Sequence, residues 1–207
     1  MDKIVCFGKN YSSHMLELGD KPVSKPVIFL KPKSVLKQAS NWGETVLATL
    51  TEEDTHYECE IILRINADGY KLLISEAENI IDSYTIGLDM TLRGKQAELK
   101  KDGHPWEISK IFPDSAIIGP WIAKESNMFY EAPFQFMLDG KLKQKASGAD
   151  MLFKPAQLVS LASHFFPLCK GDVLFTGTPV GVGSVSNGSV GTLTIKDKQF
   201  NVKWSFN

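Results

Sequence analysis

The sequence has few cysteines, and none of them is spaced for a disulfide framework or a zinc site. The three thiols, Cys6, Cys59 and Cys169, are far apart and form no C-x-x-C pair. An odd number of widely separated cysteines is typical of reduced thiols in a cytoplasmic protein. Residues 1–4 do not start the apolar stretch of a signal peptide. We therefore expect a cytoplasmic protein.

The chain also lacks an excess of charge and any apolar run of membrane-spanning length. Its 23 basic and 24 acidic residues give a formal net charge of −1, and the basic residues are scattered. A nucleic-acid-binding protein would carry a basic stripe, and a membrane helix needs about 20 consecutive apolar residues. We therefore expect neither nucleic acid nor membrane as a partner. The 207 residues, 43% of them apolar, suffice for one domain with a sizeable core.

Short apolar runs separated by turn signals predict a mainly β fold with a few short helices, of the α+β class. The segment 66–69 is expected to be a hairpin turn, and Asp139-Gly140 suits a tight turn with positive φ angles. The segment 34–45 has no clear pattern. We expect strands at 3–7, 27–30, 58–65, 70–74, 84–90, 108–112, 134–138, 141–144, 173–176, 190–195 and 199–204, and helices at 10–19, 76–81, 93–101 and 155–165.

Two acids, Glu58 and Glu60, alternate with apolar residues in the predicted strand. Successive side chains of a strand point to opposite faces, so both carboxylates share one face, about 6–7 Å apart. At an effective dielectric constant of about 20, two such charges repel by about 2–3 kcal/mol. This arrangement is tolerable if water solvates the face or if a cation lies between the two acids, and the pattern leaves both alternatives open.

A third acid, Asp89, lies near the end of the apolar strand predicted at 84–90. A set of three carboxylates suits a hard cation such as Mg²⁺, Mn²⁺ or Ca²⁺ better than zinc. Such a site would leave coordination positions for water and a chelating substrate. The alternative is that Asp89 is an unrelated residue at the end of a strand.

Other polar residues suggest further chemistry. His14 and Glu17 are neighbours on one face of a predicted helix, where a carboxylate would orient an imidazole that acts as a general base. They also fit an ordinary surface pair. Lys110 could face an acidic substrate or be solvated. The glycine-rich run 177–183 lacks the order of a phosphate loop, but its amides and the Thr178 hydroxyl could meet a carboxylate. A purely structural turn is the alternative.

Several stretches, in this order along the chain, resemble the fumarylacetoacetate hydrolase family. The match is best to its short single-domain members, which include acylpyruvate hydrolases and oxaloacetate decarboxylases. This resemblance implies a mixed β-sandwich roll, usually assembled as a homodimer. It implies one catalytic domain over 1–207, with part of 1–50 forming a lid. The stretches are 7–11 with His14, 27–32, 56–60, 87–91 with Arg93, 101–110 and 171–183.

The resemblance also implies a Mg²⁺ or Mn²⁺ cofactor and a set of site residues. The residues that match the family's functional positions are Glu58, Glu60 and Asp89 for the metal, His14, Glu17 and Lys110 for catalysis, and Arg93, Gln96, Gly177 and Thr178 for the substrate. There are departures from the family pattern at Gly94, which replaces an acid, and at 111–113 and 147–150. These departures bear on the identity of the substrate more than on metal binding.

We therefore expect a divalent-metal-dependent enzyme that hydrolyses or decarboxylates small 2-oxo acids, such as acylpyruvates or oxaloacetate, through a metal-stabilised enolate. Two alternatives stay open. One is an isomerase or tautomerase of a hydroxymuconate- or 2-hydroxyhepta-2,4-diene-1,7-dioate-type acid, which would use the same metal without attack by water. The other is a non-catalytic protein whose acids bind a metal ion such as Ca²⁺ for stability.

Overall fold

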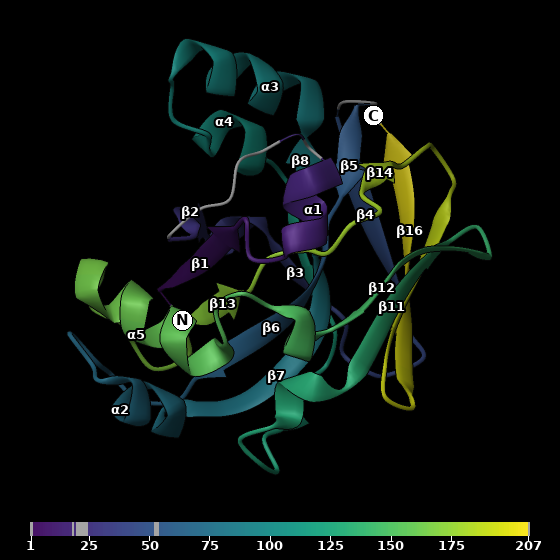
Figure 1. The fold of residues 1–207 in the computed structure, drawn as a ribbon. Helices are drawn as coiled ribbons and strands as arrows, with labels where there is room; N and C mark the ends of the chain where they lie inside the picture. Colours follow the sequence, from purple (N-terminus) through teal and green to yellow (C-terminus); the bar gives the residue numbers. More distant parts are fainter. Residues whose placement is uncertain (1, 18, 20–24, 52–53, 207) are drawn as a thin grey trace.

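The fold consists of two larger β-sheets, one small sheet and a few short helices (Figure 1). The computed structural model describes residues 2–17, 19, 25–51 and 54–206, so Leu18 and most of the predicted helix-to-strand link lie outside it. The mainly β class with short helices predicted from the sequence is confirmed. Within the described residues, no helix has the length and apolar character that crossing a membrane requires.

The larger sheet has apolar clusters on both of its faces. Ile61 and Leu63 belong to one cluster and Ile62 to the other, which explains the unbroken apolar run in this part of the sequence. Its strands follow the order β2 (Val27–Pro32), β1 (Lys3–Gly8), β13 (Val173–Phe175), β6 (Cys59–Ile65), β7 (Ile81–Asp89), β9 (Ala116–Ile118) and β3 (Leu36–Gln38), with β10 (Ile122–Ala123) paired to β7.

The second sheet packs against the first across a shared apolar core, which includes Phe136, Phe200 and Trp204. Its strands follow the order β12 (Lys141–Ser147), β11 (Pro133–Leu138), β15 (Val190–Ile195), β16 (Lys198–Phe206) and β4 (Thr45–Leu50). Asp139 and Gly140 join β11 to β12 with φ angles of 48° and 74°, as expected for a two-residue turn of this type. The predicted hairpins at 134–144 and at the end of the chain are confirmed.

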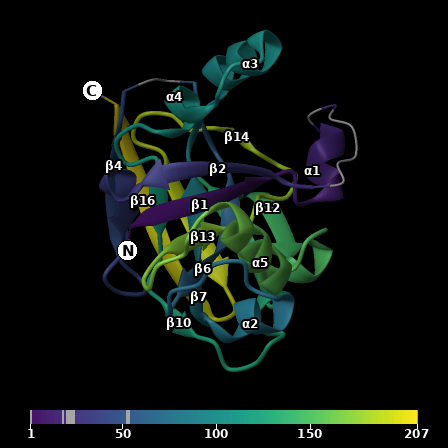
Figure 2. The ribbon, with the colours of Figure 1, turned by 90° about the vertical axis from the view of Figure 1, so that its left-hand side faces the viewer.

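The helices lie at the periphery. Figures 1 and 2 both place α3 at the end of the molecule opposite α2. The small sheet has the strand order β14 (Gly183–Ser184), β5 (Thr55–Tyr57) and β8 (Thr91–Leu92). The α-helices are α1 (Ser12–Glu17), α2 (Ile74–Asn79), α3 (Arg93–Asp102), α4 (Glu107–Lys110) and α5 (Pro155–Phe165), and the 3₁₀ helices are η1 (Lys33–Val35), η2 (Phe129–Glu131) and η3 (Gly148–Asp150).

Several local predictions are wrong, and in each case pairing or packing with distant residues decides the outcome. The turn at 66–69 does not lead into a strand at 70–74. The chain instead continues into α2, and β6 pairs with β7. Residues 108–110 are not extended, because they belong to the single turn of α4, in which the Ser109 N–H and hydroxyl donate to the Trp106 carbonyl. The segment 34–45 contains η1 and β3, and β3 is held by parallel pairing with β9.

Candidate metal and active site

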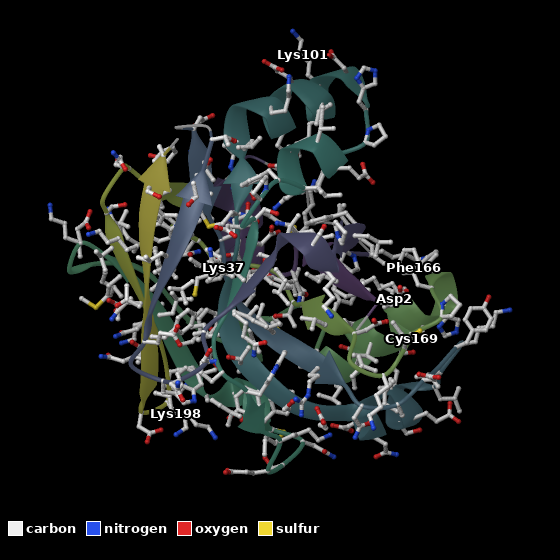
Figure 3. The ribbon with its side chains drawn as sticks, turned by 180° about the vertical axis from the view of Figure 1, so that it is seen from behind. Asp2, Lys37, Lys101, Phe166, Cys169 and Lys198 are labelled. Carbon is white, nitrogen blue, oxygen red and sulfur yellow. The ribbon has the colours of Figure 1, made fainter. Side chains whose placement is uncertain are left out.

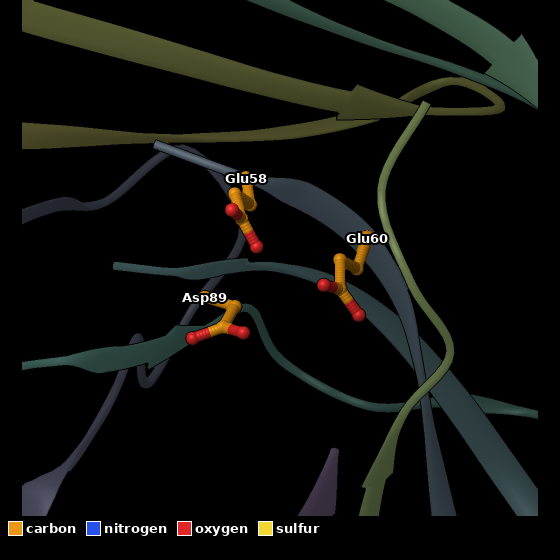
Figure 4. A group of neighbouring side chains, drawn as sticks. All are labelled: Glu58, Glu60 and Asp89. Carbon is orange, nitrogen blue, oxygen red and sulfur yellow. The ribbon is translucent and has the colours of Figure 1, made fainter. Parts of the chain in front are cut away.

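The three acids singled out in the sequence lie together, and we call them the acidic cluster: Glu58, Glu60 and Asp89 (Figure 4). One carboxylate oxygen from each lies within 4.8 Å of the others. Their exposed fractions are 7%, 1% and 1%, so the acids do not form a solvated strand face. Asp89 is therefore not an unrelated residue at the end of a strand.

Strand geometry brings these acids together. Glu60 is on β6, and Asp89 is the last residue of β7, the neighbouring strand. Glu58 lies in a one-residue break between β5 and β6, and its carbonyl accepts a hydrogen bond of 2.9 Å from the Asp89 N–H. The sequence predicted an unbroken strand here, but the break still leaves both glutamates facing Asp89 (Figure 4). His56 bonds to Asp54 instead of lining this site.

Three positively charged side chains, the inner cations Lys31, Lys110 and Arg93, contact the acidic cluster. Lys110 Nζ lies 2.9 Å from Glu58 Oε2 and 2.7 Å from Asp89 Oδ2. Lys31 Nζ lies 2.6 Å from Asp89 Oδ1, and Arg93 pairs with Glu58. Lys110 is 2% exposed, so it is a buried cation rather than a solvated surface lysine.

The charged groups shift one another's pKa values. Burial raises the pKa of Glu60, and the nearby carboxylates of Asp89 and Glu58 raise it further. Burial also acts to raise the pKa of Glu58, but the charges of Lys110 and Arg93 outweigh it and lower that pKa. For Lys110, burial lowers the pKa, yet the carboxylates of Asp89 and Glu58 more than offset it, so the pKa is raised. Glu60 is therefore the acid whose charge this site compensates least.

The donor set fits a hard divalent cation. All the candidate ligand atoms are carboxylate oxygens, they lie close together, and they are screened from bulk water. Burial, together with the charges of Asp89 and Glu58, disfavours the charged form of Glu60 and raises its pKa. A divalent cation beside Glu60 would compensate these charges, with Glu58, Glu60 and Asp89 as its protein ligands.

His14 and Glu17 form a pair in α1 that faces this site. His14 Nδ1 lies 3.0 Å from Glu17 Oε2, and His14 is only 6% exposed. The other oxygen of Glu17 accepts a hydrogen bond of 3.0 Å from the Gly181 N–H. A proton shared between Nδ1 and a carboxylate leaves Nε2 as the proton acceptor of the imidazole. The pair is therefore not an ordinary surface pair, since its histidine is buried and lines the cleft.

A narrow cleft opens over the acidic cluster. Arg93 and Gln96, in the first turn of α3, both line it, and Arg93 Nη1 donates to Gln96 Oε1 over 2.7 Å. Of the ten predicted site residues, eight line the cleft, and Glu17 and Gly177 lie behind His14 and Glu60. The cleft is lined by Phe7, Gly8, Lys9, His14, Phe29, Glu58, Glu60, Asp89, Arg93, Gln96, Lys100, Trp106, Lys110 and Thr178.

The glycine-rich run supports the site through its backbone. The Gly177 N–H donates to Glu60 Oε2 over 2.6 Å, and the φ angle of +97° at Gly177 is one that other residues rarely adopt. The Thr178 hydroxyl donates to the Cys59 carbonyl and accepts from Gln144 Nε2, each over 2.9 Å. Thr178 lines the cleft, but its hydroxyl is bonded to the first residue of β6 and to Gln144. The contact of this hydroxyl with a substrate carboxylate stays a prediction.

Two residues of the site were missed from the sequence. Lys31 is fully buried and shares its strand face with Phe29, so the alternation in β2 was a usable signal. Gln144 of β12 accepts from the Cys59 N–H over 2.9 Å and donates to Pro179 O over 2.8 Å, which joins β6 to the glycine-rich run. Nothing in the local sequence distinguishes Gln144 from the other polar residues of its strand.

The departure at Gly94 has a structural counterpart. The Gly94 N–H donates to Asp54 Oδ2 over 2.7 Å, and a Cβ on Gly94 would lie 2.8 Å from that oxygen. The Arg93 N–H also donates to the Asp54 carbonyl, over 3.1 Å. A carboxylate from a distant loop therefore stabilises the first turn of α3, where an acid is electrostatically favourable.

Comparisons with known proteins identify relatives along nearly the whole chain. A family model described as Fumarylacetoacetate (FAA) hydrolase C-terminal matches residues 3–202. The mitochondrial oxaloacetate tautomerase FAHD1 of Arabidopsis thaliana is 35% identical over 208 residues, covering 97% of this chain and 91% of that protein. The oxaloacetate tautomerase YcgM of Escherichia coli (strain K12) is 32% identical over 196 residues, covering 94% of this chain and 88% of that protein.

One solved structure extends the likeness to the fold. The crystal structure of fumarylpyruvate hydrolase from Pseudomonas aeruginosa, in complex with Mn²⁺ and pyruvate, matches with a TM-score of 0.92 and 31% identity. The match covers 99% of this chain and 90% of that one.

Proposed function

Because the chain belongs to the fumarylacetoacetate hydrolase family, we propose that it is a divalent-cation-dependent enzyme acting on small 2-oxo acids such as oxaloacetate and acylpyruvates. The observation that carries this proposal is the buried acidic cluster beneath a cleft that also exposes the imidazole of His14. The related hydrolase that holds Mn²⁺ and pyruvate supports the class of cofactor and of ligand. Mg²⁺ and Mn²⁺ are the two candidate cations.

Each group has a defined task in this proposal. Glu58, Glu60 and Asp89 would hold the cation, which supplies Lewis-acid polarisation of the 2-oxo acid when bound. Lys110 and Arg93 balance the negative charge of the ligand carboxylates and orient them. His14, held by Glu17, accepts and returns the proton.

The first candidate reaction breaks a bond to C3 of the 2-oxo acid. With an acylpyruvate, His14 takes a proton from water, and the hydroxide adds to the distal carbonyl. The bond from that carbon to C3 then breaks, which gives a carboxylic acid and the enolate of pyruvate, and the enolate is protonated at C3. With oxaloacetate, the same enolate forms when carbon dioxide leaves, and no water is consumed.

A second candidate reaction is the tautomerisation of oxaloacetate, and the names of the two relatives support it. Here a base removes a proton from C3, and a proton is delivered to the oxygen on C2, so no bond between carbon atoms breaks. The position of His14 in the cleft is compatible with this proton transfer as well as with activation of water. The two candidates therefore share their base and their cation ligands.

The test separates the reactions by their products. Protein treated with a chelator and then reloaded with Mg²⁺ or Mn²⁺ is given acetylpyruvate and oxaloacetate, and both pyruvate release and keto–enol exchange are followed. We expect cation-dependent turnover that His14→Gln and Glu60→Gln abolish, while the exposed control Glu98→Gln keeps it. Pyruvate release identifies cleavage, whereas exchange without pyruvate identifies the tautomerase.

Two outcomes would contradict the proposal. Full turnover in the presence of the chelator would exclude the cation, and wild-type cation dependence in Glu60→Gln would exclude this cluster as its site. Strong thermal stabilisation by Ca²⁺ without turnover of any 2-oxo acid would favour the non-catalytic alternative.

The homodimer implied by the family resemblance stays a separate prediction, which light scattering of the purified protein tests.

A further inference from the structure

The strand β12 has one buried side chain within Lys141–Ser147, all of which the structure describes, and that side chain is the polar one of Gln144. A buried amide costs free energy unless its hydrogen-bonding groups are paired. Those of Gln144 are paired. Its Oε1 accepts from the Cys59 N–H over 2.9 Å, and its Nε2 donates to Thr178 Oγ1 over 2.9 Å and to Pro179 O over 2.8 Å. One side chain therefore links the start of β6 to the glycine-rich run.

The hydrogen bonds of this network have only one consistent orientation. The Cys59 N–H can only donate, so the atom of Gln144 that faces it must be the oxygen. The amide nitrogen of Gln144 then faces Thr178 Oγ1, and this nitrogen can only donate. The Cys59 carbonyl can only accept, so the proton of the Thr178 hydroxyl must point to that carbonyl. The Thr178 hydroxyl therefore has only acceptor capacity left for any group in the cleft.

The same network borders Glu60 on two sides. Cys59, whose N–H and carbonyl both belong to the network, directly precedes Glu60 in the chain. Gly177, which directly precedes Thr178, donates its N–H to Glu60 Oε2 over 2.6 Å. Gln144 therefore fixes the distance between the backbone that carries Glu60 and the amide that binds its carboxylate.

The glycine-rich run also packs closely against β12. At Gly181 the φ angle is +102°, and a Cβ there would lie 2.1 Å from the Lys143 carbonyl oxygen and 3.3 Å from Gln144 Cγ. This contact leaves no room for the run to move toward the strand. The hydrogen bonds of Gln144 resist movement in the opposite direction. Contact and hydrogen bonds together determine where the run lies.

We propose that Gln144, which does not itself line the cleft, is a positioning residue for the cation site. It fixes Glu60 relative to the Gly177 N–H, and it commits the hydroxyl proton of Thr178 to the backbone. That hydroxyl then does not donate to a substrate carboxylate, and a group that meets it in the cleft must itself donate, as a water molecule does. This inference rests on the proposed function, because it assumes that a cation binds at the acidic cluster.

The test measures cation affinity rather than turnover. Chelator-treated protein is titrated calorimetrically with Mg²⁺, well below the Tm of each variant, so that unfolding does not contribute. Gln144→Met keeps the size of the side chain and removes its three hydrogen bonds, and we expect the Kd for Mg²⁺ to rise about tenfold, as is typical when the support of a metal ligand is lost. Thr178→Val should give a smaller rise, and Thr178→Ser, which keeps the hydroxyl, should retain most of the affinity. The two losses should not add in the double variant, because both substitutions break the same bond.

A matched variant in the same sheet controls for loss of stability. The Thr192 hydroxyl of β15 donates to Asn201 Oδ1 of β16 over 2.8 Å, and neither residue lines the cleft. Thr192→Val should therefore lower the Tm and keep the wild-type Kd for Mg²⁺. If Gln144→Met behaves in the same way, with a lower Tm and a wild-type Kd, its role is merely structural and this inference is wrong.

Titration of pyruvate into the Mg²⁺-saturated protein separates the two possible roles of Thr178. We expect Thr178→Val to change the Kd for Mg²⁺ more than the Kd for pyruvate. A hydroxyl that donates to the pyruvate carboxylate would give the reverse, a loss of about tenfold or more for pyruvate with a wild-type Kd for Mg²⁺. That result would overturn this inference and leave the proposed function standing. If the wild type binds neither Mg²⁺ nor pyruvate and turns over no 2-oxo acid, the proposed function fails, and this inference fails with it.

Discussion

Replacing Glu60 with glutamine should stabilise the protein without its cation and at the same time destroy cation binding. Glu60 has carboxylate oxygens of Glu58 and Asp89 within 4.8 Å of its own, and burial together with those charges raises its pKa. At an effective dielectric constant of about 20, each such pair of charges repels by about 3–4 kcal/mol. The inner cations offset most of this repulsion. Glutamine keeps an oxygen that can accept the hydrogen bond from the Gly177 N–H.

We expect Glu60→Gln to increase the free energy of unfolding by about 1–3 kcal/mol at pH 7 in a chelator, from the uncompensated part of that repulsion. For a chain of this size, that corresponds to a rise of roughly 2–12 °C in Tm. Glu60→Gln should stabilise rather than destabilise the protein because the pKa of Glu60 is raised in the folded state. Above the ordinary pKa of a glutamate, the folded state holds a proton that the unfolded state releases, so the wild-type residue destabilises the fold. The advantage of Glu60→Gln should therefore vanish as the pH falls below about 4.5.

Thermal unfolding followed by circular dichroism, at pH 7 and pH 5 with chelator and with Mg²⁺, measures both effects. Mg²⁺ should raise the Tm of the wild type but not that of Glu60→Gln, because binding to the folded state is what stabilises it. Glu98→Gln, on the exposed face of α3, is the control and should behave as the wild type does. A Tm of Glu60→Gln below that of the wild type in chelator, with the Mg²⁺ shift intact, would refute the reasoning.

Two other substitutions test the remaining charges. Lys110→Met removes the buried cation that Glu58 and Asp89 share and leaves each acid with one cationic partner among the described residues. It should cost about 3–5 kcal/mol in chelator by urea unfolding, with a smaller loss in Mg²⁺; an equal loss in both would contradict this. Burial acts to raise the pKa of Asp172, but Lys3 and the N–H groups of Cys169 and Asp2, all of which bond to its carboxylate, lower it overall. Asp2 and Cys169 are labelled in Figure 3. Asp172→Asn should therefore cost about 2 kcal/mol at pH 7. Urea unfolding should show the difference shrinking as the pH falls below about 4, where the carboxylate of the unfolded chain and then that of the folded protein become protonated; a difference independent of pH would contradict it.

The acidic cluster was predictable because strand alternation is a local rule. Glu58 and Glu60 are two residues apart, and Asp89 ends a strand that the apolar pattern identifies, so the sequence contains most of the geometry. The apolar residues that alternate with these acids, Tyr57, Cys59 and Ile61, belong to a single apolar cluster.

The errors have a common physical origin in contacts between distant parts of the chain. The segment 70–74 has residues that are compatible with a strand, but β7 takes the place beside β6. Lys110 stands in a four-residue helix whose local sequence has no helical periodicity, and its position depends on ion pairs with residues 21 and 52 positions away. Gln144 acts through hydrogen bonds across sheets, for which sequence spacing provides no rule.

The two carboxylate oxygens of Glu17 make different interactions. The orientation of the His14 imidazole is therefore linked to the contact between α1 and the glycine-rich run. One oxygen orients His14, and the other receives the Gly181 N–H from a loop more than 160 residues later in the chain. Movement of α1 away from that loop would break the second hydrogen bond and leave the carboxylate that orients His14 without its support from the rest of the fold. The orientation of the imidazole at the cleft is thus coupled to the contact between α1 and the loop that follows β13.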